Sequence, residues 1–172
     1  SSIGFLHSDK FRLNNDNSLS YLISLNADNK YSIRQGVDRS FNQGQGNYDK
    51  NLYREDYKYS TSTSALLGLK YKASRGSIAF NSIYLRSTES TISDGLGYLN
   101  SLESNPNYLI RLNQFEQSDY FNNQLLGDYN LSENGNHNVK AGVSFVKTNF
   151  EQPDRKTING TKNNDTDIET SY

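Results

Sequence analysis

The chain has 172 residues, enough for one domain, and only 33% of them are apolar whereas 12% are aromatic. Disordered chains are poor in aromatic residues, so this composition argues against disorder and favours polar, tyrosine-rich antiparallel β structure. The 18 basic and 19 acidic residues leave a net charge of −1, which gives no support for a nucleic-acid partner, and the absence of Cys excludes disulfides and thiolate metal sites.

Residues 1–13 show short alternations of apolar residues and predict the end of a strand. Asn14–Asn17 has the chemistry of a turn. Residues 18–26 predict a strand, because apolar residues occupy every second position: Leu19, Tyr21, Ile23 and Leu25. Residues 27–60 are polar and rich in tyrosine and are expected to form a long connection.

Residues 62–72 and 77–88 predict a hairpin around the turn Ala73–Gly76, where Gly76 is expected to take a positive φ. The first strand has a clear apolar face, made of Ala65, Leu67, Leu69 and Tyr71. The second strand is less regular, because Ile78, Phe80 and Tyr84 share one face and Ala79, Ile83 and Leu85 the other. A bulge or a change of burial is therefore expected between Phe80 and Ile83.

Residues 89–117 are expected to form a second long connection, with a short helix near Leu96–Leu102. Two more strands are predicted at 118–131 and 138–150, joined by the turn Ser132–His137, which contains the hairpin dipeptide Asn134-Gly135. Their apolar faces consist of Phe121, Leu125, Tyr129 and Leu131 in the first and Val139, Ala141, Val143 and Phe145 in the second. Residues 151–172 are expected to form a third long connection.

Three short turns thus alternate with three long polar segments. The predicted fold class is all-β, an antiparallel meander that forms part of a transmembrane outer-membrane β-barrel with short periplasmic turns and long extracellular loops. Each predicted strand is long enough to cross a bilayer when tilted, with lipid on its apolar face. Five polar residues are assigned to the lumen because a charge facing lipid costs roughly 2–4 kcal/mol at the midplane: Lys70, Lys72, Gln124, Asp128 and Lys140.

No catalytic, cofactor-binding or metal residue is predicted, and no cofactor is expected. His7 and His137 are the only histidines, and His137 lies in a predicted turn. Gly44-Gln45-Gly46 lacks the Gly-Lys-Ser/Thr ending of a phosphate loop, and Asp154, Asp165 and Asp167 lack the spacing of an EF-hand. Among the tyrosines, Tyr57 and Tyr59 are expected in an interfacial aromatic girdle, whereas Tyr48 and Tyr53 could touch ligand.

The chain shows neither a signal peptide nor about 18 consecutive apolar residues, as a membrane helix would need. It does not begin with Met and ends in a polar run, so we expect an internal fragment of a longer protein.

Nearly the whole sequence resembles the barrel of TonB-dependent outer-membrane receptors of Bacteroidetes-type bacteria. The resemblance is carried by YSIRQGVDRSFNQGQGNYDKNLYRED, STSALLGLKYKASRGSIAFNSIYLRSTES and IRLNQFEQSDYFNNQLLGDYNLSENGNHNVKAGVSFVKTNFEQPDRK. It implies a barrel of about 22 strands around a plug, located in the outer membrane of a Gram-negative bacterium. It also implies energy from the inner-membrane TonB complex, a surface lipoprotein as a further partner, and import of a siderophore, oligosaccharide or peptide. The plug domain, the TonB box and the barrel-closing strand have no counterpart in this chain.

Two other functions stay open. A passive porin or adhesin barrel would share the strand pattern without energy coupling. A soluble secreted β-sandwich that binds carbohydrate would share the alternation but not the need for lipid. An enzyme is not expected, because no carboxylate pair, nucleophile–base pair or metal spacing emerges.

Overall fold

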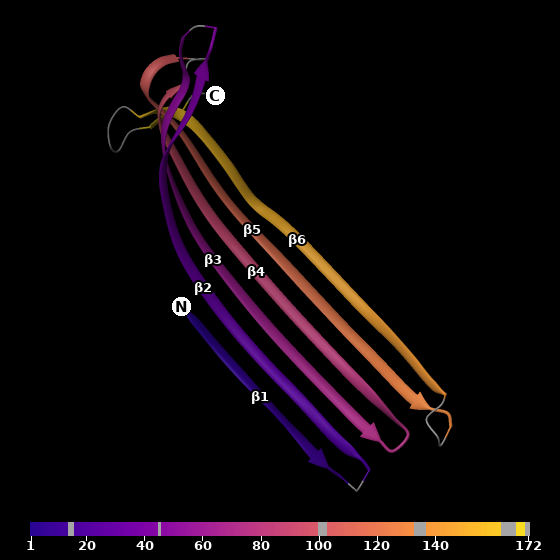
Figure 1. Ribbon diagram of the computed structural model, residues 1–172. Coiled ribbons are helices and arrows are strands. Elements are labelled where there is room, and N and C mark those ends of the chain that lie inside the picture. The colour runs from indigo at the N-terminus through magenta and orange to yellow at the C-terminus, as the bar shows by residue number, and fades with distance from the viewer. Residues whose placement is uncertain (14–15, 45, 100–102, 133–136, 163–167, 171–172) are drawn as a thin grey trace. The chain divides into compact units, whose positions relative to one another are not determined.

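The computed structural model describes residues 1–13, 16–44, 46–99, 103–132, 137–162 and 168–170. They form seven strands: β1 (Ser2–Arg12), β2 (Ser18–Asn42), β3 (Asn47–Ala73), β4 (Gly76–Leu99), β5 (Glu103–Asn130), β6 (Asn138–Lys162) and β7 (Ile168–Thr170). The strands lie in one sheet in chain order, as Figure 1 shows for β1 to β6, and β1 pairs antiparallel with β2 as β6 does with β7. The predicted all-β antiparallel meander is confirmed.

The three long connections were predicted wrongly. Residues 27–60 belong mostly to β2 and β3, residues 89–117 to β4 and β5, and most described residues of 151–172 to β6. The predicted helix near Leu96–Leu102 is also wrong over 96–99, which lie in β4, whereas 100–102 fall outside the described residues. The physical reason is that strand pairing needs backbone hydrogen bonds but no apolar side chains, and cross-strand polar pairs are enough to support it.

The chain divides into two compact units, which are described separately. Unit 1 comprises Ser1–Asn29, Thr61–Ser87 and Gln117–Phe150, and unit 2 comprises Lys30–Ser60, Thr88–Glu116 and Glu151–Tyr172. Strands β2 to β6 therefore contribute residues to both units.

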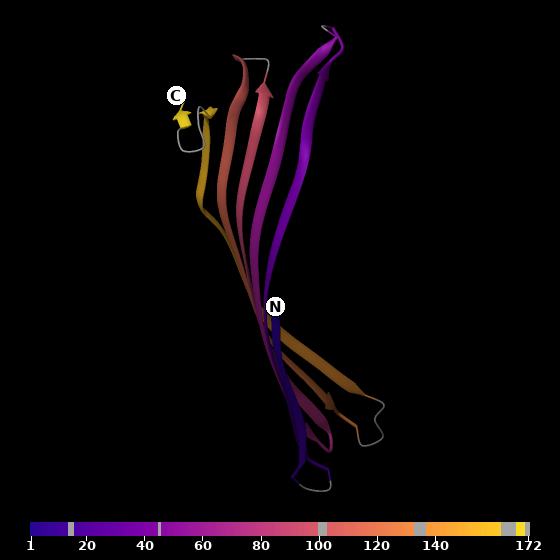
Figure 2. The ribbon, with the colours of Figure 1, turned by 90° about the vertical axis from the view of Figure 1, so that its left-hand side faces the viewer.

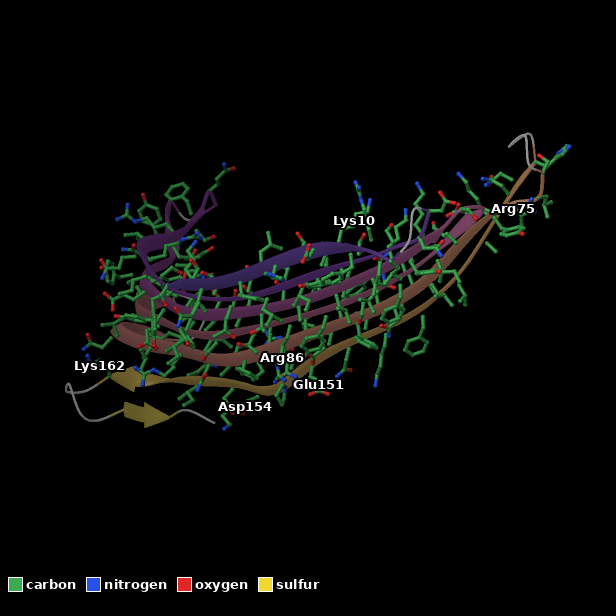
Figure 3. All side chains as sticks on the ribbon, turned by 90° about the horizontal axis from the view of Figure 1, so that it is seen from below. Lys10, Arg75, Arg86, Glu151, Asp154 and Lys162 are labelled. Atoms are coloured by element: carbon green, nitrogen blue, oxygen red, sulfur yellow. The ribbon has the colours of Figure 1, made fainter. Side chains whose placement is uncertain are left out.

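The β3–β4 hairpin of unit 1 turns where the sequence predicts. β3 ends at Ala73 and β4 begins at Gly76, so Ser74 and Arg75 form the connection (Figure 1, Figure 2), and Arg75 is labelled at its tip in Figure 3. The expected positive φ at Gly76 is wrong, since the described glycines with positive φ are Gly46 and Gly97. A Cβ at Gly76 would instead overlap the carbonyl oxygen of Asp128, so this position needs glycine for the close approach of β5. Asn134-Gly135 and Asn14-Asn15 lie outside the described residues.

Buried apolar side chains are few. In the described part of the chain they are Leu52, Tyr108 and Leu109, all of which belong to unit 2. Unit 1 instead carries many exposed large apolar side chains, such as Ile3 at 76% and Val143 at 66%. Domains in water normally bury such side chains between two packed layers. The described residues of unit 1 provide a single layer.

Candidate functional site

The side chains of unit 1 separate into two faces, and the register of β1 and β2 shows the first part of this division. Phe5 lies opposite Leu25, His7 opposite Ile23 and Phe11 opposite Leu19. Residues opposite one another in an antiparallel pair point to the same face, and successive residues point to opposite faces. The odd-numbered residues of both strands therefore share one face, which is largely apolar.

Side-chain contacts extend this division to β3 and β4. Asn26 Nδ2 donates to Ser64 Oγ at 3.3 Å. A Cβ on Gly68 would lie 3.6 Å from both Leu22 Cβ and Asn81 Oδ1. Even-numbered residues of β2 and β3 thus share a face with odd-numbered residues of β4.

Further contacts carry the division across β5 and β6. Ser77 Oγ donates to Asp128 Oδ1, and Asn138 Nδ2 donates to Asn130 Oδ1 at 2.8 Å. A Cβ on Gly142 would lie 2.7 Å from Leu126 Cδ2. Even-numbered residues of β5 and β6 therefore lie on the same face as Asn26, Ser64 and Asn81.

We call this the polar face of unit 1. All five residues that were assigned to a lumen belong to it by alternation: Lys70, Lys72, Gln124, Asp128 and Lys140. Lys10, which pairs with Ser20, also lies on it, and its side chain stands clear of the ribbon in Figure 3. Ser, Asn and Gly supply most of the remaining positions, with a minority of apolar residues such as Leu22 and Leu66.

The opposite face, called the apolar face, gathers the apolar rows of all six strands. It contains Ile3, Phe5, Phe11, Leu19, Tyr21, Ile23, Leu25, Ala65, Leu67, Leu69, Tyr71, Ile78, Phe80, Tyr84, Phe121, Leu125, Tyr129, Val139, Ala141, Val143 and Phe145. The predicted apolar rows therefore lie on one common face. The bulge or change of burial expected between Phe80 and Ile83 is wrong. Contacts of Ser77 and Asn81 on one face and of Tyr84 on the other fit uninterrupted alternation, and residues 79–84 are all half-buried.

One end of the apolar face carries polar side chains that bond to each other. Tyr84 Oη donates to Asp119 Oδ1 at 3.1 Å, and Arg86 Nη2 donates to Gln117 Oε1 at 2.8 Å. Nearer the hairpin turn, Tyr71 and Tyr129 are exposed. His7 lies within the face, and its Nδ1 is 2.9 Å from Tyr21 Oη. Paired polar groups therefore lie at one end of the apolar face, and two exposed tyrosines lie near the hairpin turn at the other end.

Unit 2 has a different chemistry, dominated by ion pairs between neighbouring strands. Lys50 Nζ lies 2.6 Å from Asp38 Oδ2, and Arg54 Nη1 lies 3.5 Å from the same oxygen. Arg54 Nη2 donates to Ser93 Oγ at 2.9 Å, and Ser93 Oγ in turn donates to Asp56 Oδ1 at 2.5 Å. These groups join β2, β3 and β4 into one polar network.

Two acidic groups of this unit are held in their charged form. The hydrogen bond from Lys50 lowers the pKa of Asp38 below its usual value, although partial burial opposes this. The hydrogen bond from Lys58, at 2.7 Å, likewise lowers the pKa of Glu89. Both carboxylates are therefore ionised at neutral pH and paired with a lysine.

A pocket of about 260 Å³ opens beside this network in unit 2. Its charged lining residues are Asp38, Lys50, Arg54 and Arg155. Its other lining residues are Leu52, Ser93, Gly95, Ile110, Leu112 and Thr157. We call it the basic pocket, because three cations face one carboxylate. A second hollow of about 490 Å³ lies in unit 1 at the hairpin turn, between residues 71–78 and 127–129.

The tyrosines that were considered as ligand contacts lie elsewhere. Tyr53, Tyr57 and Tyr59 alternate with Lys50, Leu52 and Arg54 along β3, so they point to the other face from the basic pocket. Tyr57 Oη donates to Glu55 Oε2 at 2.8 Å, and the Tyr59 ring packs on Tyr31. Tyr48 packs on Phe41, with Arg39 5.7 Å above its ring.

The other candidates of the sequence form no chemical site. His137 is exposed, and its backbone N–H donates to Ser132 Oγ at 3.3 Å. Asp154 pairs with Lys156 at 3.1 Å, whereas Asp165, Asp167 and Gln45 lie outside the described residues. Sequence reasoning missed Asp38, Lys50, Arg54 and Arg155. A partial signal was available in Tyr53, Tyr57 and Tyr59, which occupy alternate positions typical of a strand and place Lys50 and Arg54 together on the opposite face.

Within the described residues, no three His, Cys, Asp or Glu side chains gather as a metal site would require, and no helical segment has the length and apolar character of a membrane span. No family model, curated protein or solved structure matches the chain. The features of the molecule that bear on function are therefore the two faces of unit 1 and the basic pocket of unit 2.

Proposed function

We propose that this chain is part of the barrel wall of a TonB-dependent outer-membrane receptor, which binds a nutrient and imports it with inner-membrane energy. The observation that carries the proposal is the apolar face of unit 1, which spans six adjacent strands and opposes a polar face. An exposed apolar surface of this extent is not stable in water and indicates a partner layer or lipid. Lipid covers such a face directly, while the polar face meets the water of a lumen.

Backbone hydrogen bonding supports lipid as the covering layer. Sheet strands satisfy their backbone groups with neighbouring strands, which is a requirement for crossing the hydrocarbon core. The unit 1 segments of β2 to β6 have about a dozen residues each, compared with about 9–11 for a tilted transmembrane strand. The full strands are too long for that role, since β3 has 27 residues and β5 has 28. In the proposal, the ion-paired residues of unit 2 lie in water.

The edges of the sheet support a larger barrel. β1 and β6 carry apolar rows of unit 1, yet in the described residues only the short β7 covers β6, through Gly160 to Lys162, and β1 has β2 as its one neighbour. Free strand edges are not stable in lipid. In the proposal, further strands of the same receptor pair with these edges, and Ser74-Arg75 is a periplasmic turn. A nutrient ligand, the TonB complex and a surface lipoprotein are the proposed partners.

The orientation of the faces can be tested by site-directed labelling, because the chain has no Cys of its own. Leu67→Cys lies on the apolar face, and the adjacent Leu66→Cys is its matched control on the polar face. An environment-sensitive fluorophore on residue 67 of the full-length protein, folded in vesicles of brominated lipid, should be quenched, whereas the label on residue 66 should not. Equal quenching at the two positions contradicts a lipid-facing apolar surface.

Two further measurements separate the alternatives. Recovery of the full-length protein in the soluble fraction after cell breakage would contradict the receptor and would favour the secreted β-sandwich. If the protein is in the outer membrane, nutrient uptake in cells with and without TonB decides between the receptor and a passive porin. Uptake that persists at the same rate without TonB would favour the porin.

A further inference from the structure

We propose that the basic pocket binds a small organic anion, such as a sugar acid or sugar phosphate, and that this anion is the recognised part of the nutrient. The inference depends on the proposed receptor function and names the chemistry of its ligand. Its starting point is the charge of the pocket, where Lys50, Arg54 and Arg155 face one acidic side chain, Asp38.

The three cations of the pocket differ in how far acidic side chains already neutralise them. Lys50 and Arg54 both contact Asp38, and Arg54 also lies 3.7 Å from Asp56, which borders the network. Arg155 is exposed on β6 and has no hydrogen bond or ion pair with any part of the chain that the structure describes. Its positive charge is therefore available to a ligand.

A guanidinium suits a planar carboxylate or a phosphate, because its N–H groups can donate two parallel hydrogen bonds. The hydroxyl of Thr157, two residues along β6, also lines the pocket and can donate to the same anion. Arg54 is fixed by Asp38 and Ser93, so it adds positive charge without having to reorganise. These groups define a place for one anionic group.

The floor of the pocket is apolar. Leu52 is 2% exposed, and Ile110 and Leu112 also line the pocket. The volume of about 260 Å³ lies just below the range of about 300–1,000 Å³ that is typical of small-molecule sites. A single sugar ring or similar carbon skeleton therefore fits better than a whole oligosaccharide. The carbon face of such a ring would rest on these three side chains.

The test compares ligands that differ only in charge. Calorimetric titration of the full-length protein in detergent would use glucuronate and glucose 6-phosphate, each against glucose. The anions should bind at least about 10-fold more tightly than glucose, because a hydrogen bond to a charged group is stronger than one between neutral groups. Added salt should weaken the binding of the anions, because it screens their attraction to the cations of the pocket. Equal binding of glucose and the anions, or no binding of either anion at millimolar concentration, overturns the proposal.

Arg155→Ala should weaken the binding of the anions by about 10-fold or more and leave the binding of glucose unchanged. Arg155→Lys should recover part of the lost affinity, because it retains the charge. Lys156→Ala is the matched control, since it removes the neighbouring cation, which pairs with Asp154 and does not line the pocket. Equal losses in Arg155→Ala and Lys156→Ala would indicate a general field effect and contradict the site. If uptake depends on TonB but shows no preference for anions, the anion-binding role of the pocket is contradicted and the receptor function is not. If a soluble protein binds anions in an Arg155-dependent way, the receptor function is contradicted and the anion-binding role of the pocket is not.

Discussion

Arg111 and Asp94 form a two-point ion pair between β5 and β4, with 2.7 Å from Nε to Oδ1 and 2.6 Å from Nη2 to Oδ2. Both belong to unit 2, and the hydrogen bonds to Asp94 raise the pKa of the Arg111 guanidinium above its usual value. Such a fork geometry is more favourable than a single contact between the same charges. It shows how polar pairs can hold neighbouring long strands together where few apolar side chains are buried.

A double-mutant cycle with Arg111→Lys and Asp94→Asn should give a coupling free energy of about 1 kcal/mol, at the upper end for partly exposed pairs. Lysine cannot reproduce the two parallel bonds, so Arg111→Lys alone should lose part of this energy. The measurement is urea unfolding of the folded protein in detergent. The matched pair Lys156–Asp154, whose side chains are 69% and 56% exposed, should show coupling near zero. Equal coupling in the two pairs would mean that the fork geometry contributes nothing.

Acidification should loosen the ion-paired network of unit 2. The pKa of Asp38 is lowered from its usual value of 3.8 and that of Glu89 from 4.5, so their pairing stabilises the folded state above these values. This stabilisation is lost as the pH falls through the lowered folded-state pKa values. Amide hydrogen exchange at Asp38 and its β3 neighbours should therefore become faster between about pH 5 and pH 3 than the intrinsic pH dependence predicts.

Asp38→Asn is the matched variant for this effect. It should exchange faster than the wild type at pH 6 and should show a smaller further change on acidification, because one of the titrating groups is gone. If the variant and the wild type respond to acid in the same way, the Lys50–Asp38 pair makes no contribution to the stability of these strands.

The sequence predicted the strands of unit 1 but not their continuation. Alternation of Leu19, Tyr21, Ile23 and Leu25 was clear because polar residues separate large apolar ones. The same odd-numbered alternation continues in Tyr31, Ile33, Val37 and Phe41, but charged and polar neighbours on both sides made the stretch resemble a loop. In this stretch the period of two indicates the strand correctly, whereas the polar composition does not.

The basic pocket could not be found from sequence alone, for a different reason. Its residues come from five strands, β2 to β6, and Arg155 is more than 100 positions from Lys50 in the printed sequence. Only the register of the sheet brings them together. The role of Gly76 also depends on register, because the clash that a side chain would cause involves Asp128 of β5 rather than the turn itself.

Gly76→Ala should destabilise the protein by about 1–3 kcal/mol, because the added methyl group would force β4 and β5 apart at the Asp128 carbonyl. The free energy of unfolding in urea measures this change. Gly36→Ala is a suitable control, since a Cβ there would meet nothing within 4 Å. It should be neutral or stabilising by up to about 1 kcal/mol, because glycine within a strand costs conformational entropy. A neutral Gly76→Ala would contradict the close approach of β5.

A charge placed on the apolar face should be far more costly than one placed on the polar face next to it. Leu69 lies on the apolar face and is 40% exposed, and Leu66 lies three positions away on the polar face. Leu69→Arg should destabilise the folded protein in lipid vesicles by about 2–4 kcal/mol, because an arginine that faces the hydrocarbon must be taken out of water. Leu66→Arg should cost about 1 kcal/mol or less, because its side chain would reach the water of the lumen. If the two variants lost equal stability in lipid, residue 69 would not face the hydrocarbon, and the assignment of lipid to the apolar face would be contradicted.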